Sequence, residues 1–179
     1  MHNTVDTVGQ LAIHWEDLPV GTRYTTSSRT ITEGDVAAFA ALTGDFNRLH
    51  VDAEYARQSV MGQRIAHGML VASFMAGLTS RSIVNQLMEG ALFGVLENTV
   101  KYPKPTFIGD TIHVEIEVVE QRETRNPGRG IVRFLRKAIN QRGEVACELG
   151  ATCLVGRRTP ATAATPEPGT GEQLEQRRA

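Results

Sequence analysis

The stretch GMLVASFMAGL, residues 68–78, decides the fold class of this chain. Its apolar residues surround a helical axis on almost every side, and Ser73 is the main polar interruption. A helix that is apolar all round is buried, so we expect this segment to be a core helix. Apolar residues continue through Ile83 and Met88, which predicts that the helix runs on and stops at Gly90.

After residue 90 the apolar pattern changes to a period of two, which is typical of strands. Thr111–Val119 alternates most clearly, and NPGRG (residues 126–130) and QRG (141–143) are turn signals. The strands expected here are residues 92–100, 111–119, 131–140 and 144–155. One buried helix followed by long antiparallel strands predicts an α+β fold, in which the sheet curls around the helix. Upstream, Tyr24–Thr30 is an expected edge strand.

The length of 179 residues, with 41% apolar and 22% charged residues, suits one globular domain. We expect that domain to cover residues 1–156. Residues 157–179 are rich in Pro, Thr, Gly, Glu and Arg, which predicts a disordered tail. The net charge of −1 offers no basic field for nucleic acid or for an anionic membrane.

Residues 1–10 have neither the basic start nor the apolar run of a secretory signal, and residues 65–78 are too short to span a bilayer. Cys147 and Cys153 fall on one expected strand, roughly 20 Å apart at the usual rise per residue, so free thiols are expected. Both observations predict a cytoplasmic protein.

A second helix is expected before the core helix, and both of its ends carry clear signals. Thr32 is the expected N-cap, with Asp35 at the capping-box position. Gly44 supplies a left-handed stop at the C-terminal end. The residue that follows, Asp45, therefore begins at a firmly held point of the backbone.

The candidate active site is GDFNRLHV, residues 44–51. Asp45, Asn47 and His50 stand at i, i+2 and i+5, which fits neither one helix face nor one strand face. We therefore expect a loop that turns three polar side chains toward a common point. A carboxylate and an imidazole that face one small volume can bind and activate water. Singly, the three residues are more often a turn former, a turn residue and a packed histidine.

Gly68 is the second candidate, because it opens the buried helix. A helix N-terminus presents free N–H groups and positive partial charge, which can hold a developing oxyanion. The alternative is that Gly68 only relieves packing and His67 caps the helix. No metal site is expected, because the spacing of Asp45, His50, Asp52 and Glu54 matches no coordination geometry; Asp52 is better explained as the cap of a short helix.

Gly44-Asp45-x-Asn47-x-Leu49-His50, Ala56 and then His67-Gly68-Met69 together resemble the MaoC-like family, the (R)-specific enoyl-CoA hydratases of the hydratase 2 type. The resemblance covers about residues 30–155. It implies the hot-dog fold, an antiparallel sheet wrapped around a long central helix, and a homodimer or higher homo-oligomer. Arg48 departs from the family pattern, which usually has proline there, and this leaves the substrate range open.

The resemblance also implies a reaction, the reversible hydration of a 2-enoyl-CoA to an (R)-3-hydroxyacyl-CoA. Asp45 and His50 would hold one water, and one of them would remove its proton while the other delivers a proton to C2. Because their titrations would be coupled, the sequence leaves open which one is the base. Asn47 would position the water or the His50 ring, and the Gly68 N–H would bind the thioester oxygen. The acyl-CoA is the substrate, and no cofactor is expected.

Two other functions remain open on the sequence. A hot-dog acyl-CoA thioesterase usually takes a carboxylate from its central helix, and this chain has no Asp or Glu from Gly68 to Met88. A non-catalytic, acyl-CoA-binding subunit of a heteromeric assembly is the third function. The intact Asp45–His50 pair disfavours it.

Overall fold

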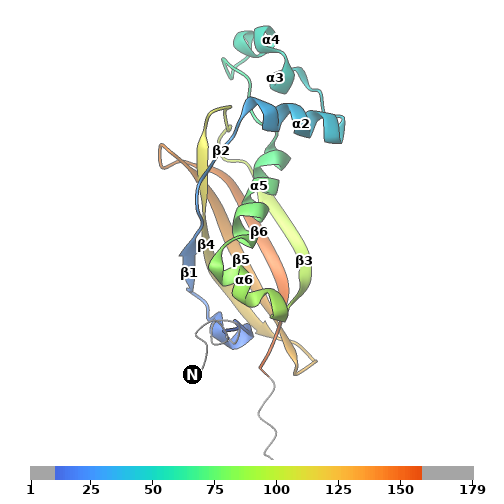
Figure 1. Ribbon diagram of the computed structural model, residues 1–179, viewed down its shortest axis with the longest axis vertical. Helices are drawn as coiled ribbons and strands as arrows, with labels where there is room; N and C mark the ends of the chain where they lie inside the picture. The colour runs from blue at the N-terminus through green and yellow to red at the C-terminus, as the bar shows by residue number, and fades with distance from the viewer. Residues whose placement is uncertain (1–10, 159–179) are drawn as a thin grey trace, which may run out of the picture.

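The computed structural model of this chain describes residues 11–158, and Figure 1 shows an antiparallel sheet that curls along helix α5. The sheet has six strands in the order β1-β4-β5-β6-β3, and β2 also pairs with β4. The predicted α+β architecture is confirmed. The helices are α2 (Glu33–Thr43), α3 (Arg48–Val51), α4 (Ala53–Gln58), α5 (Gly68–Ser80) and α6 (Ile83–Met88), with 3₁₀ turns η1 (Trp15–Asp17) and η2 (Glu89–Ala91). The strands are β1 (Arg23–Thr25), β2 (Arg29–Thr30), β3 (Leu92–Lys101), β4 (Thr111–Glu123), β5 (Arg129–Asn140) and β6 (Val145–Gly156).

The core lies between the concave face of the sheet and α5. Alternate residues of β4 point inward, as the sequence pattern predicts, and the same holds for β5 and β6. The helix contributes the other half of this core, so the sheet and α5 bury each other's apolar faces. Buried members of the core are Ile112, Val114, Ile116 and Val118 from β4, and Leu70, Val71, Met75 and Leu78 from α5.

The core helix is shorter than predicted, because α5 ends at Ser80 and a separate helix, α6, begins at Ile83. Ser82 explains the break. Its hydroxyl donates to the carbonyl of Thr79 at 2.7 Å and accepts from the backbone N–H of Asn85 at 3.4 Å. These bonds make Ser82 the N-cap of α6. The apolar run that predicts one helix is therefore divided by a capping serine.

One face of α5 is also more exposed than the prediction of a helix buried all round. Met69, Ser73, Ala76, Gly77 and Ser80 are exposed and recur at helical spacing. Met69 keeps 58% of its surface. Small side chains occupy most of this face, so it is flat as well as largely apolar.

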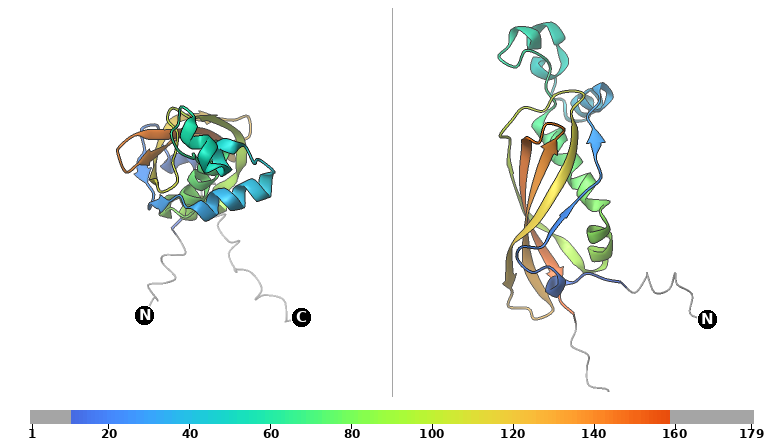
Figure 2. Two further views of the ribbon diagram at one scale, coloured as in Figure 1. Left: turned by 90° about the horizontal axis from the view of Figure 1, so that it is seen from above. Right: turned by 90° about the vertical axis from the view of Figure 1, so that its left-hand side faces the viewer.

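Helix α2 forms as its end signals predict. The Thr32 hydroxyl accepts from the Asp35 N–H, and the Asp35 carboxylate accepts from the Thr32 N–H. Gly44 ends the helix at φ 76°, in the left-handed conformation that glycine favours. The next segment differs from the predicted loop, because Arg48–Val51 forms the short helix α3 with Asn47 as its N-cap. Helices α2, α3 and α4 together lie at one end of the sheet, around the N-terminal end of α5 (Figure 2).

The expected edge strand at Tyr24–Thr30 is split into β1 and β2, both paired with β4. In the gap, the Thr26 hydroxyl accepts from the Val114 N–H at 3.0 Å, so a side chain replaces part of the ladder. Cys147 and Cys153 are free and buried, as predicted.

Arg157 and Arg158, the first two residues of the predicted tail, contact the folded part of the chain. Arg157 pairs with Glu16 and Glu123, and Arg158 pairs with Asp17, so these two residues are tied to the body. The rest of the predicted tail lies outside the described residues. Within residues 11–158, no helix is long and apolar enough to cross a membrane.

Candidate active site

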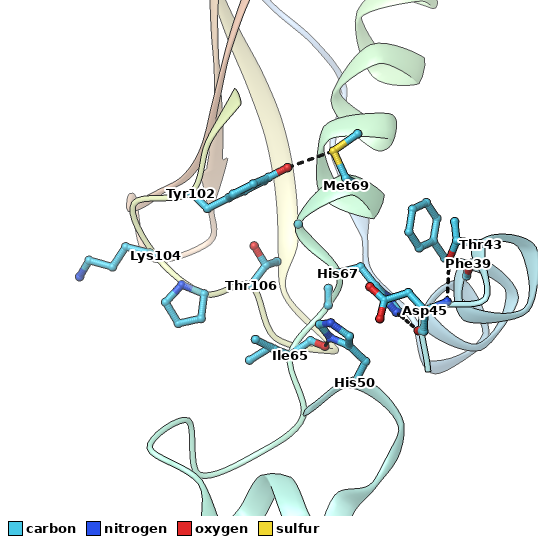
Figure 3. A pocket seen from close by; sticks show the side chains of 13 residues that line it. Phe39, Thr43, Asp45, His50, Ile65, His67, Met69, Tyr102, Lys104 and Thr106 are labelled. Carbon is cyan, nitrogen blue, oxygen red and sulfur yellow. Dashed lines mark hydrogen bonds between the residues drawn. The ribbon is translucent and has the colours of Figure 1, made fainter. Parts of the chain in front are cut away.

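A pocket of about 450 Å³ opens where α5 begins, between α2, α3 and the segment that follows β3 (Figure 3). Both predicted catalytic residues, Asp45 and His50, line it, and so does Gly68. Elements far apart in the sequence therefore meet at this corner. The lining residues are Phe39, Thr43, Asp45, His50, Ile65, Ala66, His67, Gly68, Met69, Tyr102, Lys104, Pro105 and Thr106.

Asp45 is placed by the end of α2 and is only lightly hydrogen-bonded. Its backbone N–H donates to the Thr43 hydroxyl at 3.3 Å, and its Oδ1 accepts from the Asn47 N–H at 3.3 Å. Both contacts are long, and the side chain is exposed at the pocket. Most of the acceptor capacity of this carboxylate is left for a ligand or water.

His50 lies on α3 and is oriented by a backbone carbonyl. Its Nδ1 lies 2.8 Å from the carbonyl oxygen of Ile65. Because a carbonyl only accepts, Nδ1 carries the proton of this bond. The Leu49 carbonyl in turn accepts from the Ile65 N–H at 3.2 Å, which ties α3 to the segment before α5. Nε2 is the nitrogen left to exchange a proton with the pocket.

Asn47 does not line the pocket, although the sequence predicts it as a supporting residue. Its Oδ1 accepts from the Leu49 N–H at 3.0 Å and so caps α3, while its own N–H binds the Asp45 carboxylate. The structure therefore connects Asn47 to both neighbours through the backbone. It supports the helix that carries His50 and helps to orient Asp45.

His67 is the residue that sequence reasoning left with only a capping role. Its position is the N-cap of α5, but its side chain makes no capping hydrogen bond. The residue is 2% exposed, and its ring stacks on the His50 ring, with centroids 3.8 Å apart and planes at 31°. Its Nε2 lies 2.9 Å from the backbone oxygen of Asp45. The His67-Gly68 pair in the sequence pointed to this position. It did not reveal the side-chain role, because the residues that contact the His67 ring come from α3 and from the end of α2.

Gly68 is the first residue of α5 and lines the pocket. The packing alternative also has support, because a Cβ on Gly68 would lie 2.7 Å from Cζ of Tyr102. The Tyr102 hydroxyl contacts the Met69 sulfur at 3.3 Å, and burial raises the pKa of Tyr102, so the phenol stays protonated. Glycine is thus required where a tyrosine ring covers the start of the helix.

Arg48 does not reach the pocket. Its guanidinium binds the Asp52 carboxylate at 2.9 and 3.1 Å and lies 4.3 Å from the centre of the Tyr55 ring. Asp52 meanwhile caps α4 by accepting from the Tyr55 N–H, as the sequence predicts. In place of the proline usual in the family, this chain has a side chain that braces α3 against α4.

Ligand-type atoms of Asp45, His50 and His67 all lie within 4.8 Å of one another, a grouping that the sequence did not reveal. Imidazole lone pairs lie in the ring plane. The two rings are stacked with centroids 3.8 Å apart and planes at 31°, so one ion could not lie in both ring planes at the ~2 Å of a metal–nitrogen bond. That is a poor arrangement for the converging ligands of a metal ion. Single hydrogen bonds to a small molecule need less convergence, so the grouping suits water better.

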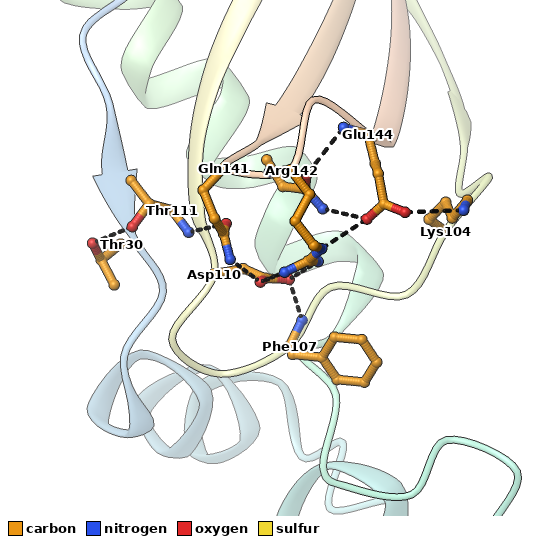
Figure 4. Close-up of polar contacts among 9 residues, drawn as sticks. Thr30, Lys104, Phe107, Asp110, Thr111, Gln141, Arg142 and Glu144 are labelled. Carbon is orange, nitrogen blue, oxygen red and sulfur yellow. Dashed lines mark hydrogen bonds and ion pairs between the residues drawn. The ribbon is translucent and has the colours of Figure 1, made fainter.

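The far wall of the pocket is held by a polar network around Asp110 (Figure 4). Burial alone would raise the pKa of Asp110, but hydrogen bonds from Arg142, the Phe107 N–H and Gln141 outweigh it and lower that pKa. Glu144 accepts from Asn140, Arg142 and Lys104, which lowers its pKa to about 2. The network ties the β5–β6 turn to residues 104–110, and the Thr106 carbonyl then accepts from the Ala66 N–H beside His67.

Residues 17–137 match the family model of the MaoC like domain. An (R)-specific enoyl-CoA hydratase of Rhodospirillum rubrum is 32% identical over 149 residues, covering 83% of this chain and 96% of that protein. The crystal structure of a MaoC-like dehydratase from the same organism superposes with a TM-score of 0.75 at 31% identity, covering 83% of this chain and all of that one. A Mycobacterium tuberculosis protein described as having a double hot-dog fold gives a TM-score of 0.69 at 18% identity, over 89% of this chain and 47% of its own.

These likenesses define the class first: the chain has the hot-dog fold and is a hydro-lyase of the hydratase and dehydratase kind. More narrowly, it belongs to the MaoC-like dehydratase family.

Proposed function

We propose that this protein catalyses the reversible hydration of a 2-enoyl-CoA to an (R)-3-hydroxyacyl-CoA. The observation that carries the proposal is the spacing of Asp45 and His50, which line one pocket and have a carboxylate oxygen and an imidazole nitrogen within 4.8 Å of each other. A water that makes two hydrogen bonds of ordinary length, at a near-tetrahedral angle, joins partners about 4.5 Å apart. In the proposed mechanism one water molecule bridges the two side chains across this separation.

The reaction balances on this pair. An O–H bond of the water breaks as its oxygen bonds to C3, and the electrons of the C2–C3 double bond move toward the thioester oxygen. One member of the Asp45–His50 pair takes the proton from water, and the other gives a proton to C2. Two such transfers are each worth roughly 10²–10⁴-fold in rate. Because both groups lie around one water, hydroxyl and proton reach the same face of the double bond.

The N–H of Gly68 is the group that binds the thioester oxygen. It opens α5, whose first N–H groups and dipole favour negative charge. A donor of this kind contributes about 2.7–4 kcal/mol of transition-state stabilisation. Because Asp45, His50 and Gly68 supply the proton transfers and the charge stabilisation, the proposed reaction takes the CoA thioester as substrate and requires no further cofactor.

The thioesterase alternative is less well supported, because α5 carries no carboxylate that faces the pocket. A silent, acyl-CoA-binding subunit would not need Asp45 and His50 oriented toward one point. The name of the Rhodospirillum rubrum relative agrees with hydration of an enoyl-CoA. Cytoplasmic location remains part of the proposal, together with the reducing environment that two free buried thiols suit.

We also propose that the protein forms a homodimer through the edge of β3. Among the described strands β3 pairs only with β6, and its outward residues include Phe93 (65% exposed) and Leu96. The exposed flat face of α5 is also available for a second copy. An uncovered apolar edge invites pairing with another chain. Light scattering should give about twice 19.6 kDa, and a mass of 19.6 kDa alone would reject the dimer.

The function is tested by mixing the purified protein with crotonyl-CoA and longer or branched 2-enoyl-CoA thioesters. Loss of the ultraviolet absorbance of the enoyl thioester reports hydration, and chiral analysis of the product reports its configuration. The proposal predicts turnover with at least one thioester and an (R) product. No turnover across the panel, or release of free CoA instead, would reject it.

A further inference from the structure

We propose that His67 is a positioning residue that fixes the spacing of Asp45 and His50, an inference that rests on the proposed function. The backbone of His67 is held at the start of α5, because its carbonyl accepts from the Val71 N–H at 3.2 Å. Its side chain takes no part in capping that helix and turns toward the pair instead (Figure 3). The role of the His67 ring must therefore be inferred from the residues that it contacts.

The His67 ring contacts both members of the pair. Nε2 donates to the backbone oxygen of Asp45 at 2.9 Å, which holds the residue that follows the end of α2. One ring face stacks on His50 at 3.8 Å, and Phe39 packs at 5.1 Å with its ring tilted by 50°. A single buried side chain thus connects the end of α2 to α3. The Asp45–His50 distance is set through it.

The remaining nitrogen of His67 indicates which form of the ring the site uses. Because Nε2 carries the proton of the bond to Asp45, a neutral ring has its lone pair on Nδ1. That Nδ1 is buried and has no hydrogen-bond partner among the described residues. Proteins seldom leave a buried polar atom unpaired without a functional reason.

The stacking with His50 supplies such a reason. A proton on Nδ1 would make His67 a cation in face contact with the ring that must gain or lose a proton during turnover. Two stacked cations would repel each other. A neutral His67 offers an aromatic face instead, which attracts a cation. The contacts of His67 therefore favour the tautomer that donates from Nε2 to Asp45 and leaves Nδ1 bare beside the His50 stack.

Two substitutions separate anchoring from simple packing. In His67→Gln the side-chain amide reaches the position of Nε2 and can still donate to Asp45, whereas in His67→Asn it reaches only the position of Nδ1. Displacing a reacting group by about 1 Å can cost roughly 10²-fold in rate. We expect His67→Asn to lower kcat by about that factor and His67→Gln by about tenfold less. KM for crotonyl-CoA should change little in both variants, because the proposed role of His67 is to hold Asp45 and His50 and not to bind the thioester.

Imidazole nitrogen NMR of the unaltered protein tests the same contacts without turnover. The expected tautomers are Nε2–H for His67 and Nδ1–H for His50, with His50→Gln used to assign the signals. A charged His67, or a proton on its Nδ1, would overturn the inference. So would a folded His67→Asn variant with an unaltered kcat, or one as active as His67→Gln.

The failure of this inference is distinct from failure of the proposed function. If the unaltered protein hydrates crotonyl-CoA while folded His67→Asn does so equally fast, only the positioning role is wrong. If the unaltered protein hydrates none of the thioesters, the proposed function is wrong, and the positioning role falls with it even where NMR finds the expected contacts. Circular dichroism and thermal unfolding show whether each variant is folded.

Discussion

Asp45 lines the pocket, whereas Asp110 lies behind residues 104–106 of the opposite wall, and the surroundings of these two aspartates differ sharply. Asp110 is 3% exposed and accepts four hydrogen bonds, two from Arg142 and one each from Gln141 and the Phe107 N–H. Asp45 is exposed and accepts one long bond, from the Asn47 N–H. Protein donors occupy the acceptor positions of the Asp110 carboxylate. Most acceptor positions of the Asp45 carboxylate, which lies near His50, have no protein donor.

This difference separates a carboxylate that stabilises the fold from one that is available to a ligand. A saturated carboxylate stabilises the loop that forms the pocket wall, and it has nothing left to offer a ligand. An unsaturated carboxylate adds little to stability and can bind water. Substitution of the two residues should therefore affect different quantities, activity for Asp45 and stability for Asp110.

The largest effect is expected at the catalytic pair. Asp45→Asn and His50→Gln should each lower kcat/KM for crotonyl-CoA by roughly 10²–10⁴-fold, because each removes one proton transfer. Thermal unfolding should change little for Asp45→Asn, because that carboxylate accepts one long hydrogen bond; His50→Gln also loses the Nδ1 bond to Ile65 and the stack on His67, so its stability should fall more. Enoyl-thioester absorbance and calorimetry measure the two quantities. Normal turnover by both Asp45→Ala and His50→Ala would contradict the mechanism.

Asp110→Asn should give the opposite pattern. An amide in place of the carboxylate puts N–H groups against donors, and the unmade hydrogen bonds should lower the free energy of unfolding by about 1–3 kcal/mol. Urea unfolding measures this change. The residual kcat of folded protein should stay within a few-fold of the unaltered value, on the order of the effects expected away from reacting atoms. A large loss of kcat in Asp110→Asn, with unchanged stability, would contradict the different roles assigned to Asp110 and Asp45.

Substitution of Gly68 tests whether the Tyr102 ring requires glycine at this position. The new Cβ of Gly68→Ala would meet the Tyr102 ring. This overpacking should cost about 1–3 kcal/mol of stability. Adding Tyr102→Ala should recover part of that loss, and Tyr102→Ala alone is the matched control. No recovery in the double variant would show that Tyr102 is not the obstacle.

The smallest effect concerns pH and the network around Asp110. Hydrogen bonds from Asn140, Arg142 and Lys104 lower the pKa of Glu144 to about 2. The contribution of the ionised Glu144 to the free energy of unfolding is therefore complete at a pH above the ordinary glutamate pKa near 4.5. It is lost as the pH falls from there toward the lowered pKa. Unfolding curves across that range should show a smaller decline in Glu144→Gln than in the unaltered protein. Equal declines would remove Glu144 as the cause.

Local patterns were enough to predict much of this structure. The capped helix α2, the alternating strand β4 and the turns around Gly143 all depend on neighbours in sequence, and each is confirmed. Asp45 and His50 are also close in sequence, after the end of α2, and both line one pocket. The four residues of α3 are too few to give a periodic signal, so the expected loop was wrong there.

Contacts between distant residues explain what the sequence did not predict. The break between α5 and α6 depends on Ser82, whose capping signal was hidden in an apolar run. The role of His67 depends on Asp45 and His50. The need for glycine at position 68 depends on Tyr102, which follows β3 and is far from α5 in the sequence. Periodicity carries no information on such pairs.

Hydration of crotonyl-CoA in heavy water tests the central claim most directly, because the proposed mechanism places one water between Asp45 and His50 on one side of the pocket. The account predicts a 3-hydroxybutyryl-CoA of (R) configuration, with one deuterium at C2 on the same face as the new hydroxyl. NMR of the product reads both centres. A product with hydroxyl and deuterium on opposite faces, or no product, would contradict the claim that these two side chains share one water.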